Sequence, residues 1–470
     1  MRRRSTWMLS GCIAVVVFAA YVILSQPLLQ RLQSVRHEVI GNIELSRQIL
    51  DSFGAKGYSS QTLLVFANHA EQRTGGGFVG SVGVLHGKNG KLSLDSIRSI
   101  YFYDHRLEEK AAFQAAPPYF QNLSTNILAR DSLLDGDSAV NARQFRDLFA
   151  REAGVYADNV VIITPKVLQL LLTYTGGIEI PEYGITITAN NVLTTLQQEI
   201  ETGSDKTSGK DPKTILGVLA NRLIGKLPDL SADQVSRLYA DMFQLMSTRQ
   251  AYIYSPDDAL MKRLARWQQP PVEIGSPGSM QITAANHIAN KSSQAVVQKT
   301  SAFIRIANDG TRRLQLSVVR HHTKEATPPY IDPRDGKPYQ LIGDDLSWLQ
   351  VALPAGSQLV DPASGFQQVS TTPVTLFGRD ILTKPLATTQ VTAEFAIGKQ
   401  QELGQSITGV ETLLAQFGWF GQEYSLTIEG PEGYIAQPKE SAEVLANGRQ
   451  LRYTGFQVSD KQFPYEFKRQ

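Results

Sequence analysis

The side chains best suited to chemistry gather in one short stretch, which begins at Asn68 and reads Asn-His-Ala-Glu-Gln-Arg-Thr-Gly-Gly-Gly-Phe-Val-Gly. It holds one carboxylate (Glu71), one guanidinium (Arg73) and four glycines, among them Gly76 and Gly77. Glycines let backbone N–H groups approach a ligand, as in phosphate-cradling loops, and an arginine can grip a phosphate with two N–H groups. The stretch is neither a Walker motif nor a dinucleotide fingerprint. The alternative is an irregular loop in which Glu71 pairs with Arg73 or Asn68 caps a turn.

A second candidate cluster is Asn-Ala-Arg-Gln-Phe-Arg-Asp, residues 141–147. Arg143 and Arg146 are three residues apart, so on a helix they share one face and could clamp a polyanion. The alternative is a solvated helix face on which Arg143 and Asp147 form an ordinary i,i+4 ion pair. The sequence leaves both interpretations open.

Other chemistries have little support in the sequence. There is no Gly-x-Ser-x-Gly nucleophile elbow and no His-Glu-x-x-His metal motif. Cys12 is the only cysteine, which excludes an intramolecular disulfide and a cysteine-based zinc site. The adjacent His321 and His322 would point to opposite faces of a strand, which suits a shared metal ion poorly. No metal ligands are therefore predicted. A phosphoryl-transfer site of arginines and carboxylates would match this sparse pattern, because that chemistry depends mainly on positioning and charge neutralisation.

Composition narrows the class of protein. The 470 residues are too many for one hydrophobic core, so two or three domains are expected. Hydrophobic residues make up 42% and charged residues 19%, as in ordinary globular proteins. The 46 basic and 44 acidic side chains leave a net charge of +2, which argues against a dedicated nucleic-acid-binding protein.

The N-terminus has the pattern of a membrane anchor. Three arginines at positions 2–4 precede an uncharged run from Trp7 to Ser25. About 20 apolar residues span a bilayer as a helix, and flanking arginines stay cytoplasmic. The run is longer than the apolar core of a cleaved signal peptide, and no small-residue cleavage site follows it. A lipoprotein-like box at residues 9–12 precedes the run rather than follows it. The prediction is a single-pass protein with its bulk outside the cytoplasm.

The rest of the chain divides by its pattern. Short apolar runs such as Thr62–Ala67 and Asn159–Thr164 alternate with helical patterns, which predicts a sheet covered by helices. After residue 302 the pattern is alternation with frequent turn signals, which predicts an antiparallel β-sandwich. Residues 203–212 are expected to be a flexible surface loop. The predicted segments are a cytoplasmic stub and anchor (1–26), a helical stalk (27–59), an α/β domain (60–270), a linker (271–301) and a β-sandwich (302–470).

The motif Asn68-x-x-Glu-x-Arg-x-x-Gly-Gly-Phe-x-Gly resembles the signature of the bacterial family of unknown function numbered 4012. Further segments are similar to its middle section and to its C-terminal half, so the resemblance covers roughly residues 60–435. These segments are Asn159–Pro165, Leu170–Pro181, Ile187–Val192, Ala289–Ser292, Leu353–Ser357 and Tyr424–Gly433.

That family is in turn similar to the LytR-CpsA-Psr proteins, which transfer glycopolymers from polyprenyl pyrophosphate to peptidoglycan outside the cytoplasm. The shared pattern is a strand, a helix and then Gly176-Gly-Ile-Glu-Ile. In those enzymes arginines grip the pyrophosphate and an aspartate helps to hold magnesium. The resemblance implies a LytR-CpsA-Psr-like mixed sheet, a phosphate-binding role for Arg73 first and for Arg143 and Arg146 second, and Mg²⁺ by analogy alone.

Two functions follow as hypotheses. The first is a membrane-anchored envelope protein that binds or transfers a polyprenyl-(pyro)phosphate-linked glycopolymer to the cell wall, as a phosphotransferase-like enzyme or a relative that only binds. The second is a non-catalytic envelope scaffold that acts through its β-sandwich. The predicted ligand-binding residues are Asn68, Glu71, Arg73, Gly76, Gly77, Arg143 and Arg146.

Overall fold

The structure is a computed structural model. It describes residues 45, 48–49, 52, 59–88, 91–95, 97–104, 114–121, 123–268, 270, 272–288, 290–332, 336–371, 373–399, 403–445 and 448–470. The predicted anchor, residues 1–26, and nearly all of the predicted stalk, residues 27–59, lie outside these described residues. In the part that is described, no helix is both long enough and apolar enough to cross a membrane.

The first domain is built around one mixed sheet with strand order β10-β7-β1-β2-β3, to which β4 adds by pairing with β2. Strands β1 and β7 run parallel, and the other neighbours are antiparallel. The strands are β1 (Ser59–Arg73), β2 (Gly76–Lys88), β3 (Lys91–Leu94), β4 (Arg98–Ser99), β7 (Asn159–Ile163) and β10 (Ala251–Tyr254). Every residue of β7 is buried, as expected for a strand covered on both faces.

Helices cover both faces of this sheet, which confirms the predicted α/β architecture. Helix α5 packs on one face, and α6, α7, α9 and α10 share a hydrophobic core with the other. Thr164 caps α6 ahead of a proline, and Ser231 and Gln234 form a capping box at the start of α10. The helices are α4 (Tyr101–Asp104), α5 (Ser138–Ala153), α6 (Pro165–Thr175), α7 (Val192–Thr202), α8 (Ser204–Thr207), α9 (Thr214–Lys226), α10 (Ala232–Ser247) and α11 (Asp258–Gln268).

Two short two-stranded ribbons complete this domain: β5 (Gln114–Ala115) with β6 (Asn126–Ile127), and β8 (Ile178–Ile180) with β9 (Ile185–Ile187). Leu45 and Ile49, from the predicted stalk, are buried in the hydrophobic core on the α6, α9 and α10 side of the sheet. Their spacing of four residues places them on one face of a helix, so the stalk region contributes to the core of the α/β domain.

The second domain consists of two seven-stranded sheets that share one core. Strands such as β13 alternate buried and exposed residues, as one-sided burial requires. One sheet has the order β18-β19-β16-β11-β21-β26-β23 and the other β17-β20-β13-β12-β22-β25-β24. The strands of the first are β11 (Ser279–Asn286), β16 (Asp345–Leu353), β18 (Gln367–Ser370), β19 (Thr375–Thr383), β21 (Ser406–Leu414), β23 (Tyr434–Ala436) and β26 (Lys461–Arg469).

The strands of the second sheet are β12 (Val296–Ile306), β13 (Thr311–His322), β17 (Gln358–Leu359), β20 (Thr388–Lys399), β22 (Gln422–Glu429), β24 (Glu443–Leu445) and β25 (Gln450–Gln457). The predicted β-rich C-terminal region is therefore confirmed. Two central pairs differ from the antiparallel expectation, because β11 with β21 and β12 with β22 run parallel. Strand β11 also lies inside the segment 271–301 that the sequence suggested as a linker, so the sandwich begins before residue 302.

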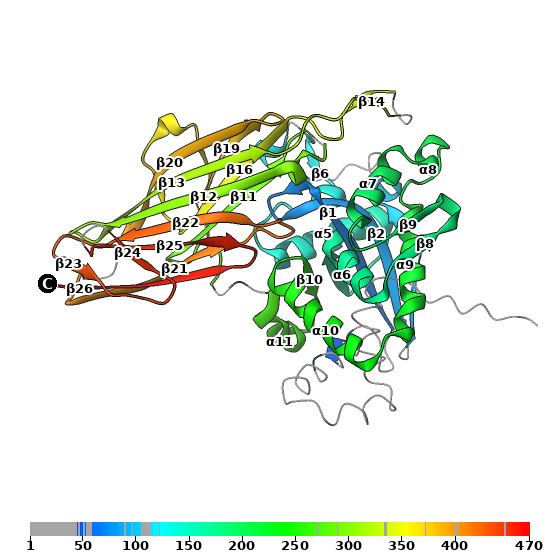
Figure 1. Ribbon diagram of the computed structural model, residues 1–470, viewed down its shortest axis with the longest axis horizontal. Helices are drawn as coiled ribbons and strands as arrows, with labels where there is room; N and C mark the ends of the chain where they lie inside the picture. Colours follow the sequence, from blue (N-terminus) through cyan, green and yellow to red (C-terminus); the bar gives the residue numbers. More distant parts are fainter. Residues whose placement is uncertain are drawn as a thin grey trace, which may run out of the picture.

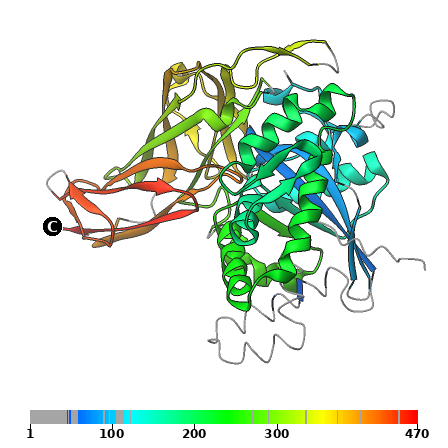
Figure 2. The same cartoon turned by 45° about the vertical axis from the view of Figure 1, so that its right-hand side comes forward.

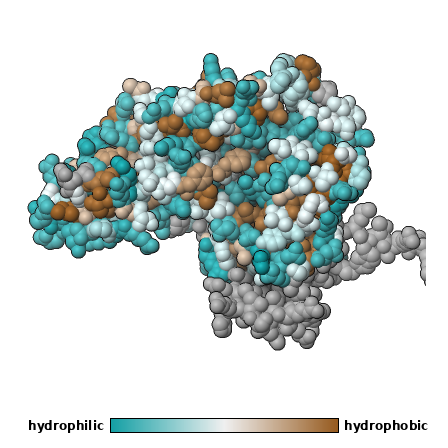
Figure 3. Space-filling view, in the orientation of Figure 1, coloured by the Kyte–Doolittle hydropathy of each residue, from teal (hydrophilic) through white to brown (hydrophobic). Residues whose placement is uncertain are grey.

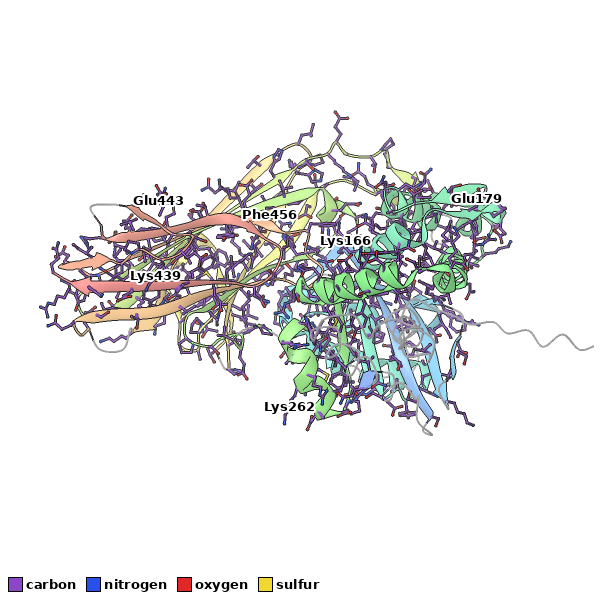
Figure 4. All side chains as sticks on the ribbon, turned by 60° about the horizontal axis from the view of Figure 1, so that its bottom comes forward. Lys166, Glu179, Lys262, Lys439, Glu443 and Phe456 are labelled. Carbon is purple, nitrogen blue, oxygen red and sulfur yellow. The ribbon has the colours of Figure 1, made fainter. Side chains whose placement is uncertain are left out.

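Figure 1 shows the sandwich, in light green to red, as an elongated body beside the α/β domain, in blue to green. Figure 4 places Lys166 near the junction and Lys439 and Glu443 at the far end of the sandwich. The junction is formed partly by residues 415–421, between β21 and β22. Phe417 joins the core under α5, and Trp419 O accepts a hydrogen bond of 2.9 Å from Gln250 Nε2.

A second connection is a hairpin arm, defined here as residues 323–344, which leaves the sandwich between β13 and β16. It carries β14 (Tyr330–Ile331) and β15 (Pro338–Tyr339). The arm extends over the α/β domain toward α7 and α8 (Figures 1 and 2), where Lys206 and Asp332 form an ion pair of 3.0 Å. The expectation of a flexible surface loop at residues 203–212 is therefore wrong in part, because this segment contains α8 and a buried lysine.

Candidate functional site

A pocket of ≈ 100 Å³ lies between the sheet and the helices α6, α7 and α9. Its walls are mainly apolar, because each helix turns its hydrophobic face toward the sheet. The apolar lining comes from Phe66 on β1, Ile163 on β7, Leu168 on α6, Leu196 on α7 and Leu216 on α9. The face of the molecule in Figure 3 mixes hydrophilic and apolar residues.

One end of the apolar pocket is charged. Lys213, immediately before α9, Glu201 near the end of α7, and Lys291 line it together with Asn68. Lys291 comes from the sandwich side of the junction, next to the 3₁₀ helix η6 (Ser292–Ala295). The pocket is thus apolar at one end and basic at the other, and its basic end is shared between the two domains.

A second, more polar chamber of ≈ 120 Å³ continues from this charged end. The two cavities share five lining residues, which are Asn68, Ile200, Glu201, Lys213 and Lys291. Tyr330 and Tyr339 of the hairpin arm line the polar chamber, as do Glu71 and Tyr101 of the α/β domain. The combined site therefore runs from an apolar pocket, past the lysines, into a polar chamber that the arm helps to enclose.

The charged side chains form one continuous series in which acidic and basic groups alternate, the ionic chain. In order it contains Asp104, Arg130, Asp131, Arg73, Glu71, Lys291, Glu201, Lys206 and Asp332. Successive members are 2.5 to 3.9 Å apart, so each interior charge has an opposite charge on both sides. A chain of this kind compensates for the removal of its charges from water, which isolated buried charges could not do.

The pKa values of Lys291 and Lys213 are shifted in opposite directions. Burial alone would lower the pKa of Lys291, but Glu71 and Glu201 outweigh burial and raise its pKa above the usual value. Burial lowers the pKa of Lys213 to about 8, although the Glu201 carboxylate opposes the shift. Among the described residues, no carboxylate lies within the 4.0 Å ion-pair distance of the Lys213 ammonium group. Lys213 is thus the lysine of this site whose charge is not already matched by a direct partner.

His69 lines the apolar pocket and is only 4% exposed. Burial, with a smaller contribution from Lys166, lowers its pKa to about 3, so its imidazole is neutral at physiological pH. Its ring lies edge-on to Phe420, with 4.2 Å between centroids, and no described residue forms a hydrogen bond with its Nδ1. A neutral ring without a partner on this nitrogen adds a polar atom to an otherwise apolar wall.

Only some of the ligand-binding residues predicted from the sequence line the cavities. Asn68 lines both cavities, and its side-chain oxygen accepts the Ala70 N–H at 3.1 Å. Glu71 lines the polar chamber and pairs with Arg73 at 3.0 Å. Both local contacts agree with the alternative interpretation of this stretch, in which Asn68 caps a turn and Glu71 pairs with Arg73.

Arg73 is part of the protein interior. It is 2% exposed, and its guanidinium donates to Asp131 at 2.7 and 3.0 Å and to Glu71 at 3.0 Å. A further N–H donates to the carbonyl of Gln72 at 3.1 Å, and the ring of Phe120 lies 5.3 Å away. With its donors engaged inside the protein, Arg73 has little capacity left for a phosphate, and it lines neither cavity.

The glycines serve close packing within the protein. A Cβ on Gly77 would lie 2.4 Å from the carbonyl of Asn68, and one on Gly75 would lie 1.8 Å from Asp135 O. A Cβ on Gly76 would come within 3.3 Å of Phe417 from the sandwich. These positions therefore allow the β1–β2 hairpin to dock against its neighbours, and they do not line the cavities.

Arg143 and Arg146 do not meet Arg73. Both lie on α5, which packs on the face of the sheet opposite the pocket. Arg146 pairs with Asp147 at 3.2 Å and lies over Tyr254, with 5.4 Å from its guanidinium carbon to the ring centroid. Among the described residues no ion pair or hydrogen bond links Arg73 to Arg143 or Arg146, so the structure does not bring the three arginines together in one site.

The sequence interpretation missed the lysines that line the site. Lys291 belongs to the Ala-Asn-Lys-Ser segment at residues 289–292, so the family resemblance offered a signal for it. Lys213 follows the segment taken for a surface loop and carried no local signal. Its Nζ lies against Gly80 of β2, where an added Cβ would come within 3.3 Å of it, and this contact across 133 residues of sequence has no local pattern.

Comparison with known proteins gives a match to one family model over part of the chain. Residues 59–200 match the family described as "Protein of unknown function (DUF4012)". No curated protein matches the sequence. Protein gbs0355 from Streptococcus agalactiae is 12% identical, with 47% of this chain and 76% of that chain covered and a TM-score of 0.31.

Two further solved structures are similar in part. Protein lpg2210 from Legionella pneumophila is 9% identical over 42% of this chain and 71% of its own, with a TM-score of 0.25. An M1 zinc metallopeptidase from Deinococcus radiodurans is 10% identical over 37% of this chain and 42% of its own, with a TM-score of 0.20. At these TM-scores neither structure informs the site.

Proposed function

We propose that the protein, whose residues 59–200 match the DUF4012 family of proteins of unknown function, binds a polyprenyl-phosphate-type lipid in the cell envelope. The observation that supports this proposal best is the pocket between the sheet and α6, α7 and α9. It is apolar along its walls and basic at one end, where Lys213 and Lys291 line it. A ligand that fits both ends has an apolar tail and an anionic head.

The energetics of such a ligand favour this orientation. Each buried methylene of the tail contributes about 0.8 kcal/mol, and the pocket offers apolar contacts on several sides. An ammonium group that meets a phosphate forms a charge-assisted hydrogen bond, which is stronger than a neutral one. Lys213 is the natural first contact, because its charge has no direct carboxylate partner among the described residues. The pocket volume suits the part of the tail next to the head group.

The residues of the site do not fit the magnesium ion that the distant resemblance implies. The two oxygens of Glu71 are engaged by Arg73 and Lys291, and those of Asp131 by Arg73 and Arg130. Within the described residues no group of three or more histidine, cysteine or acidic side chains is arranged to hold a metal ion. We therefore propose ligand binding, and derive no transfer step through a metal ion.

The placement of the protein in the envelope rests on the sequence of residues 1–26. Three arginines before an apolar run predict a cytoplasmic N-terminus and an extracytoplasmic bulk. In that arrangement the lipid-binding domain stands outside the cytoplasm, where a lipid-linked glycopolymer or peptidoglycan would be its partner. Protease added to intact cells should digest the region after residue 59, and protection of this region would contradict the placement.

The proposed function is tested by lipid binding to the full-length protein in nanodiscs, with a polyprenyl monophosphate as the probe. Leu196→Trp should block the apolar pocket, and Lys213→Met should remove the basic contact. Lys213→Met should weaken binding by about tenfold or more, since a hydrogen bond to a charged group contributes roughly 1.5–3 kcal/mol. Leu196→Trp should weaken binding by about tenfold or more because it blocks the pocket that holds the tail.

Lys226→Met is the matched control, because Lys226 ends the same helix and donates to the carbonyl of Gly177 outside both cavities. Its affinity for the lipid should equal that of the parent protein. Equal affinity in all three variants would contradict the pocket as the lipid site. The scaffold hypothesis, in which the sandwich acts alone, would then be the remaining candidate.

A further inference from the structure

The centre of the ionic chain contains an ammonium group between two carboxylates. Lys291 Nζ lies 2.5 Å from Glu71 Oε2 and 3.9 Å from Glu201 Oε1. The next link repeats the arrangement, with Lys206 Nζ 3.4 Å from Glu201 and 3.0 Å from Asp332. Two ammonium groups thus separate three carboxylates, and all of these side chains except that of Lys206 line the polar chamber.

This arrangement has the charge pattern of a bridging cation site. Carboxylates that converge on one point normally require a shared positive charge, since like charges at such distances repel strongly. In phosphate-binding sites a divalent cation often supplies that charge. Here an ammonium group fills the space between Glu71 and Glu201, and its side chain is only 12% exposed.

We propose that the site is a metal-independent phosphate site, in which Lys291 occupies the position that a divalent cation would need and Lys213 supplies the charge that meets the ligand. This inference deepens the proposed function and rests on it for the identity of the ligand. The position of Lys291 between the two carboxylates is a separate structural observation, which can be tested without any lipid.

Lys291 and Lys213 have different roles in this proposal. Lys291 is bound to Glu71 and neutralises the carboxylates that would otherwise repel a phosphate from the chamber. Lys213 has no such partner among the described residues. Because it lines both cavities, its ammonium group can contact the phosphate of a ligand in either cavity. A lysine is suited to this role because its ammonium is a compact point charge on a flexible stem.

The first test is metal dependence in the parent protein. Affinity of the full-length protein for polyprenyl monophosphate is measured in nanodiscs with excess chelator and then with millimolar Mg²⁺. The affinity should change by less than about twofold. A loss of about tenfold or more in chelator would overturn the proposal, because it would show that a bound cation carries the phosphate.

The second test removes the ammonium group. Lys291→Ala opens the space between Glu71 and Glu201, so the variant should bind Mn²⁺ with a Kd of about 1 mM or tighter, measured by the paramagnetic resonance of free Mn²⁺. The parent protein and Lys299→Ala should show no such site. Lys299 is a matched control, because it pairs with Glu423 at 3.6 Å on the exposed face of the sandwich.

Lys291→Met is tested in parallel in case the alanine variant does not fold. Failure of both folded variants to bind Mn²⁺ would overturn the assignment of a cation position to Lys291. This result is independent of the lipid, so it is distinguishable from failure of the proposed function, which would show as no lipid binding by the parent protein. Lipid affinity of Lys291→Ala should fall by about tenfold in chelator and recover in part with Mg²⁺.

Discussion

The ammonium group of Lys206 lies 3.0 Å from the carboxylate of Asp332, and both side chains are 1% exposed. This pair joins α8 of the α/β domain to the hairpin arm of the sandwich. Tyr330, beside Asp332 on the arm, donates a hydrogen bond of 3.2 Å to Glu201 on the wall of the polar chamber. The arm is therefore attached to the same ionic chain that surrounds the candidate ligand site.

Breaking this pair should destabilise the protein and release the arm. Asp332→Ala leaves a buried ammonium group short of a partner, and the loss of one member of a buried pair costs about 3–5 kcal/mol. The nearby Glu201, 3.4 Å from Lys206, should reduce the effect toward the lower end of that range. Urea unfolding gives the free energy, and hydrogen exchange should show faster exchange in β14 and β15.

Arg313→Ala is the control for that measurement. Arg313 pairs with Glu394 at 2.9 Å, but its side chain is 57% exposed. An exposed pair contributes roughly 0–1 kcal/mol, so this variant should unfold like the parent protein. Equal stability of Asp332→Ala and Arg313→Ala would mean that the arm is not held by its buried ion pair.

Arg73 should prove to be a structural residue. Arg73→Ala removes the partner of Asp131 and Glu71 inside the protein, and we expect a loss of about 3–5 kcal/mol in the free energy of unfolding. Lipid affinity of the molecules that remain folded should change much less than in Lys213→Met. A stable Arg73→Ala protein that has lost lipid binding selectively would instead support the phosphate-gripping role that the resemblance implies.

Much of the local structure could be predicted because its causes are local. The Thr164-Pro165 pair specifies the start of α6, and Ser231 with Gln234 specifies the start of α10. The pairing of Glu71 with Arg73 was also a local expectation. The two residues are only two positions apart, so the sequence alone was enough to suggest that they pair.

The site itself depends on contacts that no local pattern encodes. Glu71 and Lys291 are 220 residues apart in the chain, and their ion pair exists only because β1 docks against the segment after β11. The glycine-rich stretch was misleading for a related reason. Its glycines are required by close approach to Asp135 and Asn68, and such packing cannot be distinguished from ligand binding in a sequence.

Lipid binding should weaken at alkaline pH through Lys213. Its pKa of about 8 means that the ammonium form predominates below pH 8 and is lost above it. An anionic head group binds the charged form, so the affinity should fall as the pH rises through 8. Fluorescence titrations of a polyprenyl monophosphate across this range measure the effect.

Lys213→Arg provides the matched comparison. Guanidinium groups remain charged throughout this pH range, so the arginine variant should keep its affinity above pH 8. The same alkaline fall in both proteins would assign the titration to another group. A flat profile in the parent protein would argue that Lys213 does not meet the head group.

A second pH effect should appear in stability rather than binding. Burial raises the pKa of Glu152 from 4.5 to about 8, with a further contribution from the neighbouring Asp104 carboxylate. Between these two pH values the folded protein keeps a proton that the unfolded chain has released. The free energy of unfolding should therefore decrease as the pH rises from about 4.5 to about 8.

Glu152→Gln should remove this decrease. The amide stays neutral at every pH, and its oxygen can still accept the Ala129 N–H that now donates to Glu152 at 2.8 Å. The variant should match the parent protein near pH 5 and exceed it in stability near pH 8, as measured by urea unfolding at each pH. Glu443→Gln, at a side chain that is 64% exposed, should leave the parent profile unchanged. Parallel profiles for the parent protein and Glu152→Gln would show that Glu152 does not hold the buried proton.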